Sequence, residues 1–83
     1  MKTLGTTIKS YRLNKNLTQW DMADKLGISQ SSYSRIEGDL IEPSVESLYR
    51  LSKELDFSID ELLDSIYNSH EYNIESQNLK KKL

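Results

Sequence analysis

The 83-residue sequence contains no cysteine, one histidine and three glycines. Without cysteine, disulfide bonds, thiolate metal sites and a cysteine nucleophile are excluded. The single histidine, His70, lies in a polar stretch near the end of the sequence, which offers no framework for a Ser/His/Asp triad or a histidine metal site. Three separated glycines form no glycine-rich phosphate loop. We therefore expect a protein that is not an enzyme and that uses no cofactor, metal ion or small-molecule substrate.

Long apolar runs are also lacking. No segment approaches the roughly 20 apolar residues that span a bilayer, and residues 1–10 lack the apolar core of a signal peptide. The hydrophobic content of 36% is enough for one modest core in a chain of this length. These features predict one small cytoplasmic domain with no membrane partner.

Basic charge is scarce overall, since the net charge is −2, whereas binding to nucleic acid favours a basic surface. The charges are segregated along the chain, however. Residues 1–16 carry four basic residues and no acidic one, and residues 42–65 carry seven acidic residues and two basic ones. Where a polyanion docks depends on this segregation more than on the total. The acidic total therefore does not exclude DNA as a partner.

Apolar residues recur at steps of three and four along most of the chain, which predicts helices and no strands. Hydroxyl side chains stand where helix N-caps are expected, and Ser58 also has Glu61 three residues on, the pattern of a capping box. The fold class is expected to be all-α, a compact five-helix domain over residues 1–67. Its helices are expected over residues 3–15, 18–26, 29–37, 44–55 and 58–67, with N-caps Thr3, Thr18, Ser29, Ser44 and Ser58.

The apolar residues of the five helices are expected to face a shared core. Residues 68–83 are mostly polar and cannot bury enough surface to offset their ordering entropy. This tail is expected to be disordered, and folding against a partner subunit is the alternative. In chain order, the expected core residues are Leu4, Ile8, Tyr11, Leu13, Met22, Ala23, Leu26, Tyr33, Ile36, Val45, Leu48, Leu51, Leu55, Ile59, Leu62 and Leu63.

Residues 18–38 are expected to form two short helices joined by a glycine turn. Gly27 can adopt the positive φ that ends a helix, and Gly38 is expected to end the next helix in the same manner. The small side chain of Ala23 permits close approach of two helices that cross steeply. This pattern is typical of a helix-turn-helix at the second and third helices, in which the later helix enters the DNA major groove.

Three stretches carry a resemblance to a known family: LGTTIKSYR at 4–12, LTQWDMADKLGISQSSYSRIEG at 17–38 and PSVESLYRLSKELDFSIDELL at 43–63. They resemble the repressor/Cro-type (XRE) helix-turn-helix family of bacterial and phage transcriptional regulators. The resemblance implies a regulator that binds double-stranded DNA, usually as a homodimer on an inverted repeat and most often as a repressor. The rival interpretation is a protein-interaction module of the same fold, antitoxin-like or antirepressor-like, with weak affinity for DNA.

The resemblance also implies roles for single residues. Gln19, Lys9 and Ser29 are expected to contact the DNA backbone. Arg12 and Glu37 are expected to bridge the first helix to the end of the third. Glutamine can pair bidentately with adenine and arginine with guanine, so the outward residues of the third helix are expected to contact bases. The base-reading residues would then be Gln30, Ser31, Ser34 and Arg35, and a dimer interface on the fifth helix would use Leu62, Ile66 and Tyr67.

Two aromatic residues depart from the family pattern. Tyr33 stands where isoleucine or valine is usual, and we expect its ring in the core, with the hydroxyl at the edge, and not on DNA. Trp20 stands on the outward side of the second helix, where a polar or small residue is usual. We expect it to pack on the first helix; a phosphate contact through the indole N–H, or contact with a partner protein, are the alternatives.

Overall fold

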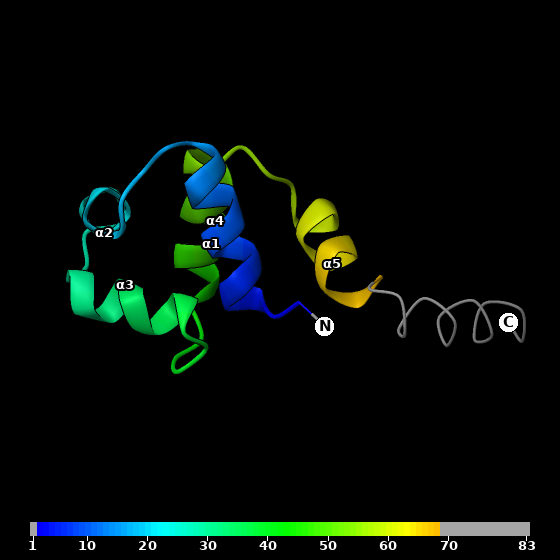
Figure 1. The fold of residues 1–83 in the computed structure, drawn as a ribbon, viewed down its shortest axis with the longest axis horizontal. Helices are drawn as coiled ribbons and strands as arrows, with labels where there is room; N and C mark the ends of the chain where they lie inside the picture. Colours follow the sequence, from blue (N-terminus) through cyan, green and yellow to red (C-terminus); the bar gives the residue numbers. More distant parts are fainter. Residues whose placement is uncertain (1, 69–83) are drawn as a thin grey trace, which may run out of the picture.

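A computed structural model describes residues 2–68, and this part of the chain contains five helices and no strand. The predicted all-α, five-helix architecture is confirmed (Figure 1). Apart from Asn68, the polar tail expected at 68–83 lies outside the described residues. None of the described helices is long and apolar enough to cross a membrane. The helices are α1 (Leu4–Asn14), α2 (Gln19–Leu26), α3 (Gln30–Glu37), α4 (Val45–Glu54) and α5 (Ile59–Tyr67).

Each helix begins at the hydroxyl N-cap expected from the sequence. In every case the side-chain oxygen accepts the backbone N–H three residues on, for example Thr18 from Asp21 at 3.0 Å. Such a cap contributes about 1 kcal/mol. At Ser58, the hydroxyl accepts the N–H of Glu61 at 3.0 Å, but the Glu61 side chain returns no hydrogen bond to the Ser58 N–H, so the expected capping box is only half formed. The caps are Thr3, Thr18, Ser29, Ser44 and Ser58.

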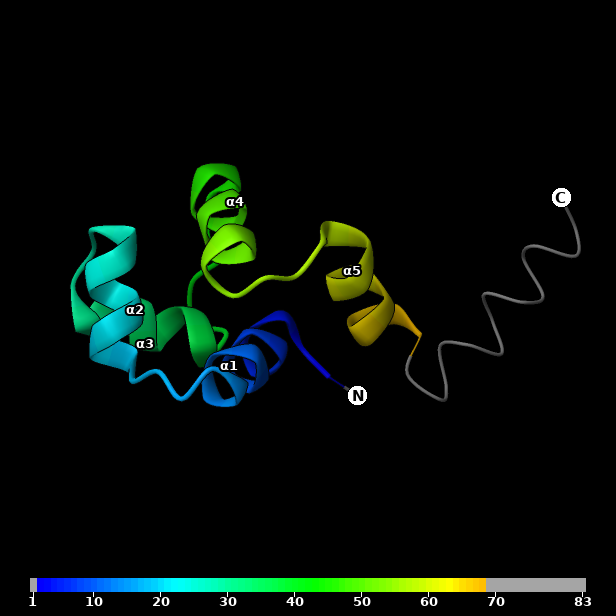
Figure 2. The ribbon, with the colours of Figure 1, turned by 90° about the horizontal axis from the view of Figure 1, so that it is seen from above.

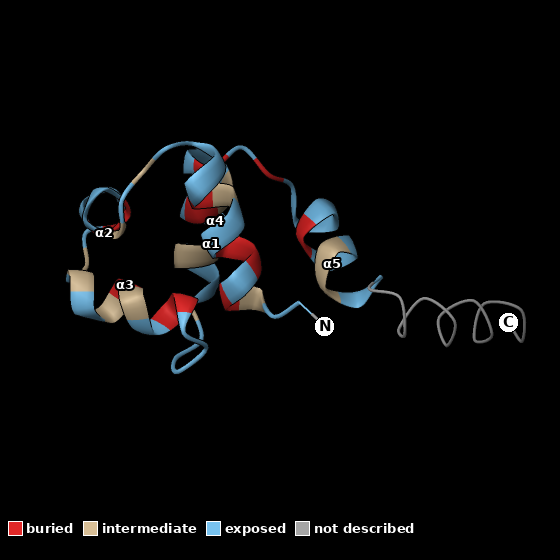
Figure 3. Cartoon of the chain, in the orientation of Figure 1, coloured by how far each residue is buried: buried red, intermediate tan, exposed pale blue. Residues whose placement is uncertain are grey.

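The helices are arranged around one small core. Two views show α2 and α3 together at one end, α1 and α4 in the middle and α5 at the other end (Figures 1 and 2). The buried residues lie on the inward sides of all the helices (Figure 3). Each helix contributes one side chain that is almost completely buried, so the core joins all five: Ile8, Met22, Tyr33, Leu51 and Leu62.

Four expected core residues are exposed instead. Val45 is 87% exposed, Leu13 53%, Leu63 44% and Ile59 43%. Val45 and Ile59 are the first residues of α4 and α5, and they lie before the first turn of each helix that packs against the core. Helices of eight to eleven residues bury only a narrow stripe, so the apolar stripe that periodicity predicts is wider than the covered one.

The two glycines of the helix-turn-helix behave differently. Gly27 has φ 69°, the left-handed conformation expected at the end of α2. Gly38 has φ −84°, so the expectation for this residue is wrong, and the left-handed conformation is taken by Asp39 at φ 59°. The Asp39 side chain also binds α1: its carboxylate accepts hydrogen bonds from the Gly5 N–H at 2.9 Å and from the Thr3 hydroxyl at 2.6 Å. The end of α3 is thereby attached to the start of α1.

Candidate nucleic-acid interface

One side of α3 faces the core and the other faces solvent. Tyr33, Ile36 and Glu37 are buried. At 3.6 residues per turn, the expected base-reading residues then fall on the opposite side. There the structure places Ser31 and Arg35 exposed and Gln30 and Ser34 half-buried at the edges of the face, so these four side chains share one surface of α3: Gln30, Ser31, Ser34 and Arg35.

Tyr33 lies entirely inside the protein, which confirms its expected place in the core. Its hydroxyl was expected at the core's edge but is buried too, where it donates to Glu37 Oε2 at 2.5 Å. Burial raises the pKa of Tyr33, and the hydrogen bond to Glu37 raises it further. Tyr33 therefore stays protonated and holds the carboxylate from within the core.

Arg12 and Glu37 form a buried ion pair between α1 and the end of α3. Arg12 Nε lies 2.6 Å from Glu37 Oε2, and Nη2 lies 3.0 Å from Oε1, so the contact is bidentate. Arg12 Nη1 also donates to the Leu17 carbonyl at 2.7 Å. The two side chains are only 7% and 3% exposed. Arg12 thus positions α3 and contributes no accessible charge to the surface.

The same carboxylate orients two glutamines. Gln19 Nε2 donates to Glu37 Oε1 at 3.1 Å, and Gln30 Nε2 donates to Gln19 Oε1 at 2.7 Å. Because a carboxylate only accepts, Gln19 must turn its nitrogen toward Glu37 and its oxygen toward Gln30. Gln30 then has its oxygen and one N–H left for other partners. Arg12, Glu37, Gln19 and Gln30 form one chain of hydrogen bonds, which we call the buttress.

Sequence reasoning missed the role of Gln19 in the buttress. Gln19 was expected to contact a DNA phosphate, yet its side chain is half-buried and most of its amide is engaged within the protein. One N–H of its Nε2 remains for a phosphate. Gln19 contacts Glu37, which is 18 positions away in the chain, and Gln30, which is 11 positions away. Helical periodicity within a single helix cannot predict contacts between helices.

The buttress makes stability depend on pH. Burial acts to raise the pKa of Glu37, but hydrogen bonds from Arg12, Tyr33 and Gln19 outweigh it, and the pKa lies below its ordinary value of 4.5. A lowered pKa stabilises the folded state fully at pH values above the ordinary pKa, and this stabilisation is lost as the pH falls through the lower pKa of the folded state. We expect the wild-type protein to be more stable than Glu37→Gln at pH 7, with the difference shrinking as the pH falls below the ordinary pKa of a glutamate. Urea unfolding at each pH measures it, and a constant difference contradicts the assignment.

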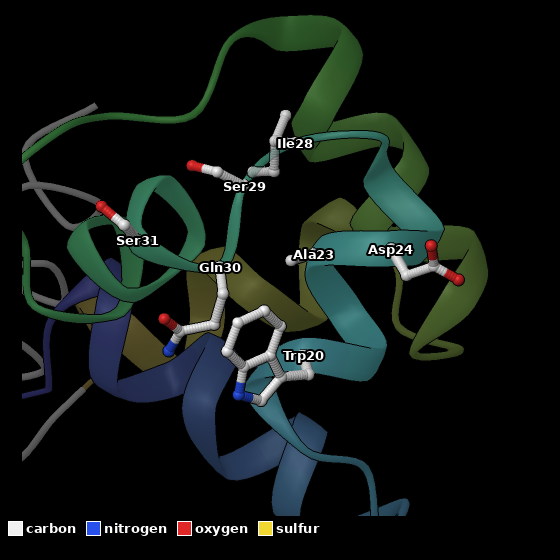
Figure 4. A pocket seen from close by; sticks show the side chains of 7 residues that line it. All are labelled: Trp20, Ala23, Asp24, Ile28, Ser29, Gln30 and Ser31. Atoms are coloured by element: carbon white, nitrogen blue, oxygen red, sulfur yellow. The ribbon is translucent and has the colours of Figure 1, made fainter.

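Other expected contact residues lie around this face. Ser29 is exposed and caps α3, and its hydroxyl also bonds that of Ser32 at 2.9 Å. Lys9 is exposed on α1, and its side chain makes no hydrogen bond or ion pair within residues 2–68, so it takes no part in the buttress. Trp20 is 72% exposed, which contradicts the expectation that it packs on the first helix. It borders a shallow pocket between α2 and α3 (Figure 4).

The expected dimer residues need correction. Leu62 is 1% exposed and belongs to the core, so it presents no face to a partner, and Ile66 is half-buried and packs against that core. The outward apolar residues of α5 are Ile59, Leu63 and Tyr67, which are 43%, 44% and 47% exposed. Their spacing of four residues places them in one stripe along α5. Of the three expected dimer residues, Tyr67 is therefore the one that lies on the outward side of α5.

Comparison with known proteins gives matches over most of the chain. A family model described as helix-turn-helix matches residues 8–62. The uncharacterized HTH-type transcriptional regulator YqaE of Bacillus subtilis is 39% identical over 70 residues, covering 84% of this chain and 60% of that protein. The HTH-type transcriptional regulator SinR of the same organism is 36% identical over 75 residues, covering 89% and 65%. The chain thus spans less than two thirds of the length of these two relatives.

Two solved structures are similar in both sequence and fold. The crystal structure of SinR, the master regulator for biofilm formation, in complex with DNA has a TM-score of 0.67 and 38% identity, and the match covers 75% of this chain and 100% of that one. A structure of the complex of the SinR and SinI proteins has a TM-score of 0.69 and 30% identity, covering 96% of this chain and 81% of that one.

Proposed function

Because the chain belongs to the XRE-type helix-turn-helix family, we propose that it is a sequence-specific double-stranded DNA-binding transcriptional regulator that acts as a repressor. The observation that carries the proposal is the outer surface of α3, where Gln30 and Arg35 stand beside two short serines. The buttress holds this surface from behind. The similar protein SinR has been crystallised in complex with DNA. Occupation of a promoter by α3 and its neighbours would exclude other DNA-binding proteins.

The buttress leaves Gln30 with the polarity that adenine requires. Adenine presents an N6 donor and an N7 acceptor in the major groove, and a glutamine pairs with both through its oxygen and one N–H. Those are the two groups of Gln30 that the bond to Gln19 leaves available. Arg35, five residues further along α3 and exposed, has the fork of donors that matches guanine O6 and N7. Ser31 and Ser34 are short and set the approach distance.

Contacts with the sugar–phosphate backbone would set the register of α3 in the groove. The remaining N–H of Gln19 and the exposed ammonium of Lys9 are available as donors for phosphates, and the hydroxyl of Ser29 would become one by turning away from Ser32. Such contacts release counterions and carry no base information. With a net charge of −2, a single protomer gains little from general attraction to DNA. We therefore assign much of the affinity to pairing of two protomers.

The apolar stripe of α5 fits a homodimer. Ile59, Leu63 and Tyr67 would pack against the same residues of a second protomer, which would present two α3 helices to an inverted repeat. Half-sites would then lie about one helical turn of DNA apart. The rival function, a protein-interaction module, is favoured by the same exposed stripe and the acidic composition, so DNA binding itself is the decisive measurement.

Selection of bound duplexes from a random pool tests the proposal. The expected result is a motif made of two inverted half-sites, with binding that weakens steeply as salt rises because several phosphates are contacted. A motif with a single half-site would contradict the dimer. Failure to enrich any duplex at low ionic strength would contradict DNA binding and favour the protein-interaction alternative.

Arg35→Ala tests base reading directly. The variant is expected to lose about 1–3 kcal/mol on the selected site and to accept any base at one position, because one bidentate contact is removed. Arg50→Ala is the matched control, since Arg50 is an exposed arginine on α4 that pairs with Glu46 at 3.1 Å. Competition binding on a set of single-base variants measures both. An equal loss on all sequences would show that Arg35 contacts the backbone instead.

A further inference from the structure

Trp20 is the single tryptophan of the chain and one of its most exposed apolar residues, at 72%. It is the second residue of α2 and follows Gln19 directly. An exposed indole offers a partner both an apolar ring face and an N–H donor. Neither the core nor the buttress uses this side chain. Its position next to the α3 surface therefore requires a separate explanation.

The surroundings of Trp20 combine an apolar floor with the start of α3. Trp20, Ala23 and Ile28 form the apolar part of a shallow pocket, and Gln30 and Ser31 of α3 border it. Figure 4 shows the Trp20 ring beside the Gln30 side chain. Asp24 borders the pocket too, and the indole nitrogen lies on the side of the ring away from it (Figure 4). Within residues 2–68, the indole N–H has no hydrogen-bond acceptor.

We propose that Trp20 is a DNA-backbone contact: its ring packs against a deoxyribose at the edge of the major groove, and its N–H donates to the adjacent phosphate. This inference rests on the proposed DNA-binding function. In helix-turn-helix complexes, the helix before the recognition helix crosses the backbone, and Trp20 lies on that helix beside Gln30 and Ser31. The Asp24 carboxylate repels a phosphate from its own side of the pocket, which directs it to the side of the indole nitrogen.

The geometry favours DNA over a protein as the occupant. A protein seated on Trp20 would also cover Gln30 and Ser31, which border the same pocket, and would block the base-reading surface. A duplex that engages α3 would pass beside Trp20, because Trp20 borders the same pocket as Gln30 and Ser31. A deoxyribose is apolar on its face and a phosphate accepts hydrogen bonds, so one nucleotide satisfies both parts of the indole. The contact would strengthen binding to every sequence alike.

Intrinsic fluorescence tests the contact without any substitution, because Trp20 is the one indole in the chain. The probe is a duplex of about 20 base pairs recovered by selection, with a duplex of mixed sequence at low salt as the second probe. Acrylamide quenching is expected to be efficient in the free protein and to fall at least twofold when either duplex is bound. Unchanged quenching at saturating duplex overturns the proposal.

Two variants separate the ring from the N–H group. Trp20→Ala is expected to raise the Kd about tenfold on all sequences, and Trp20→Phe about threefold, because phenylalanine keeps a ring but lacks the donor. Tyr49→Ala is the matched control, since Tyr49 is 61% exposed on α4; its Kd should match that of the wild type. Thermal unfolding verifies that each variant folds, as expected for exposed positions.

The outcomes distinguish this inference from the function on which it rests. If the wild type binds DNA and Trp20→Ala binds equally well, the Trp20 contact is wrong and the proposed function stands. A loss confined to one base position would place Trp20 on a base and also overturn the backbone contact. Failure of the wild type to bind any duplex would overturn both proposals together.

Discussion

Replacement of Arg12 by alanine is expected to lower the free energy of unfolding by about 3–5 kcal/mol, the usual cost of removing one partner of a buried ion pair. The Glu37 carboxylate would stay buried with its strongest partner gone, and the Leu17 carbonyl would lose its donor. Because the side chains of Arg12 and Glu37 are 7% and 3% exposed, water cannot replace the lost hydrogen bonds. Urea unfolding followed by circular dichroism measures the change.

A combined variant separates the stability of this pair from its function. Arg12→Met, Tyr33→Phe and Glu37→Leu together remove the buried ion pair and the buried hydroxyl, and are expected to restore most of the lost stability. DNA affinity should still fall, because Gln19 and Gln30 lose the carboxylate that orients them.

Arg50→Ala is the control for Arg12→Ala. Arg50 pairs with Glu46, four residues away, on the exposed surface, so its loss should lower the free energy of unfolding by no more than about 0.5 kcal/mol. If Arg12→Ala is equally mild, the pair does not hold α3.

Gly5→Ala is expected to cost about 3 kcal/mol, the upper part of the usual range for overpacking. A Cβ at this position would lie 2.4 Å from the carbonyl oxygen of Glu37 and 2.6 Å from that of Ile36. Both atoms belong to the backbone of α3, so no side chain can turn away, and α1 must separate from α3. The movement would also break the bonds of Asp39 to Gly5 and Thr3. Thermal or urea unfolding measures the loss.

Gly38→Ala is the matched control for this prediction. Its Cβ would lie 3.4 Å from the nearest atom, the Ser34 carbonyl oxygen, and its φ of −84° suits any residue. We expect no loss of stability and a gain of up to about 1 kcal/mol, since alanine restricts the unfolded chain. Equal destabilisation by both substitutions would mean that close approach at Gly5 is not the cause.

The features that could be predicted from the sequence are local ones. A hydroxyl such as Thr18 caps the helix that begins at the next residue, and Gly27 ends that helix through its own φ. Both effects act within four residues, so the local amino-acid sequence is enough to predict them. The helix bounds, the helix-turn-helix and the outward position of Arg35 on α3 follow from such local rules and from helical periodicity.

The features that could not be predicted depend on contacts between distant elements. Asp39 meets Gly5 across 34 positions, and Gln19 meets Glu37 across 18. The side of α5 that is covered depends on how it packs on α1, which the apolar pattern of α5 alone does not determine. Leu62 and Leu63 are adjacent leucines, yet one is buried and the other exposed. Only the assembled core distinguishes them.

The buttress also changes the entropy of recognition. A free glutamine side chain loses roughly 1.5–2 kcal/mol of rotamer freedom when it is immobilised, and a flexible reading residue would lose it on binding DNA. Gln30 is already restrained by Gln19, and Gln19 by Glu37, before any duplex arrives. The loss of rotamer freedom therefore occurs when the domain folds and not when DNA binds, so less of the free energy of the DNA contacts is offset on binding. If Gln30 contacts bases as proposed, folding stability and DNA recognition are thermodynamically coupled through Glu37.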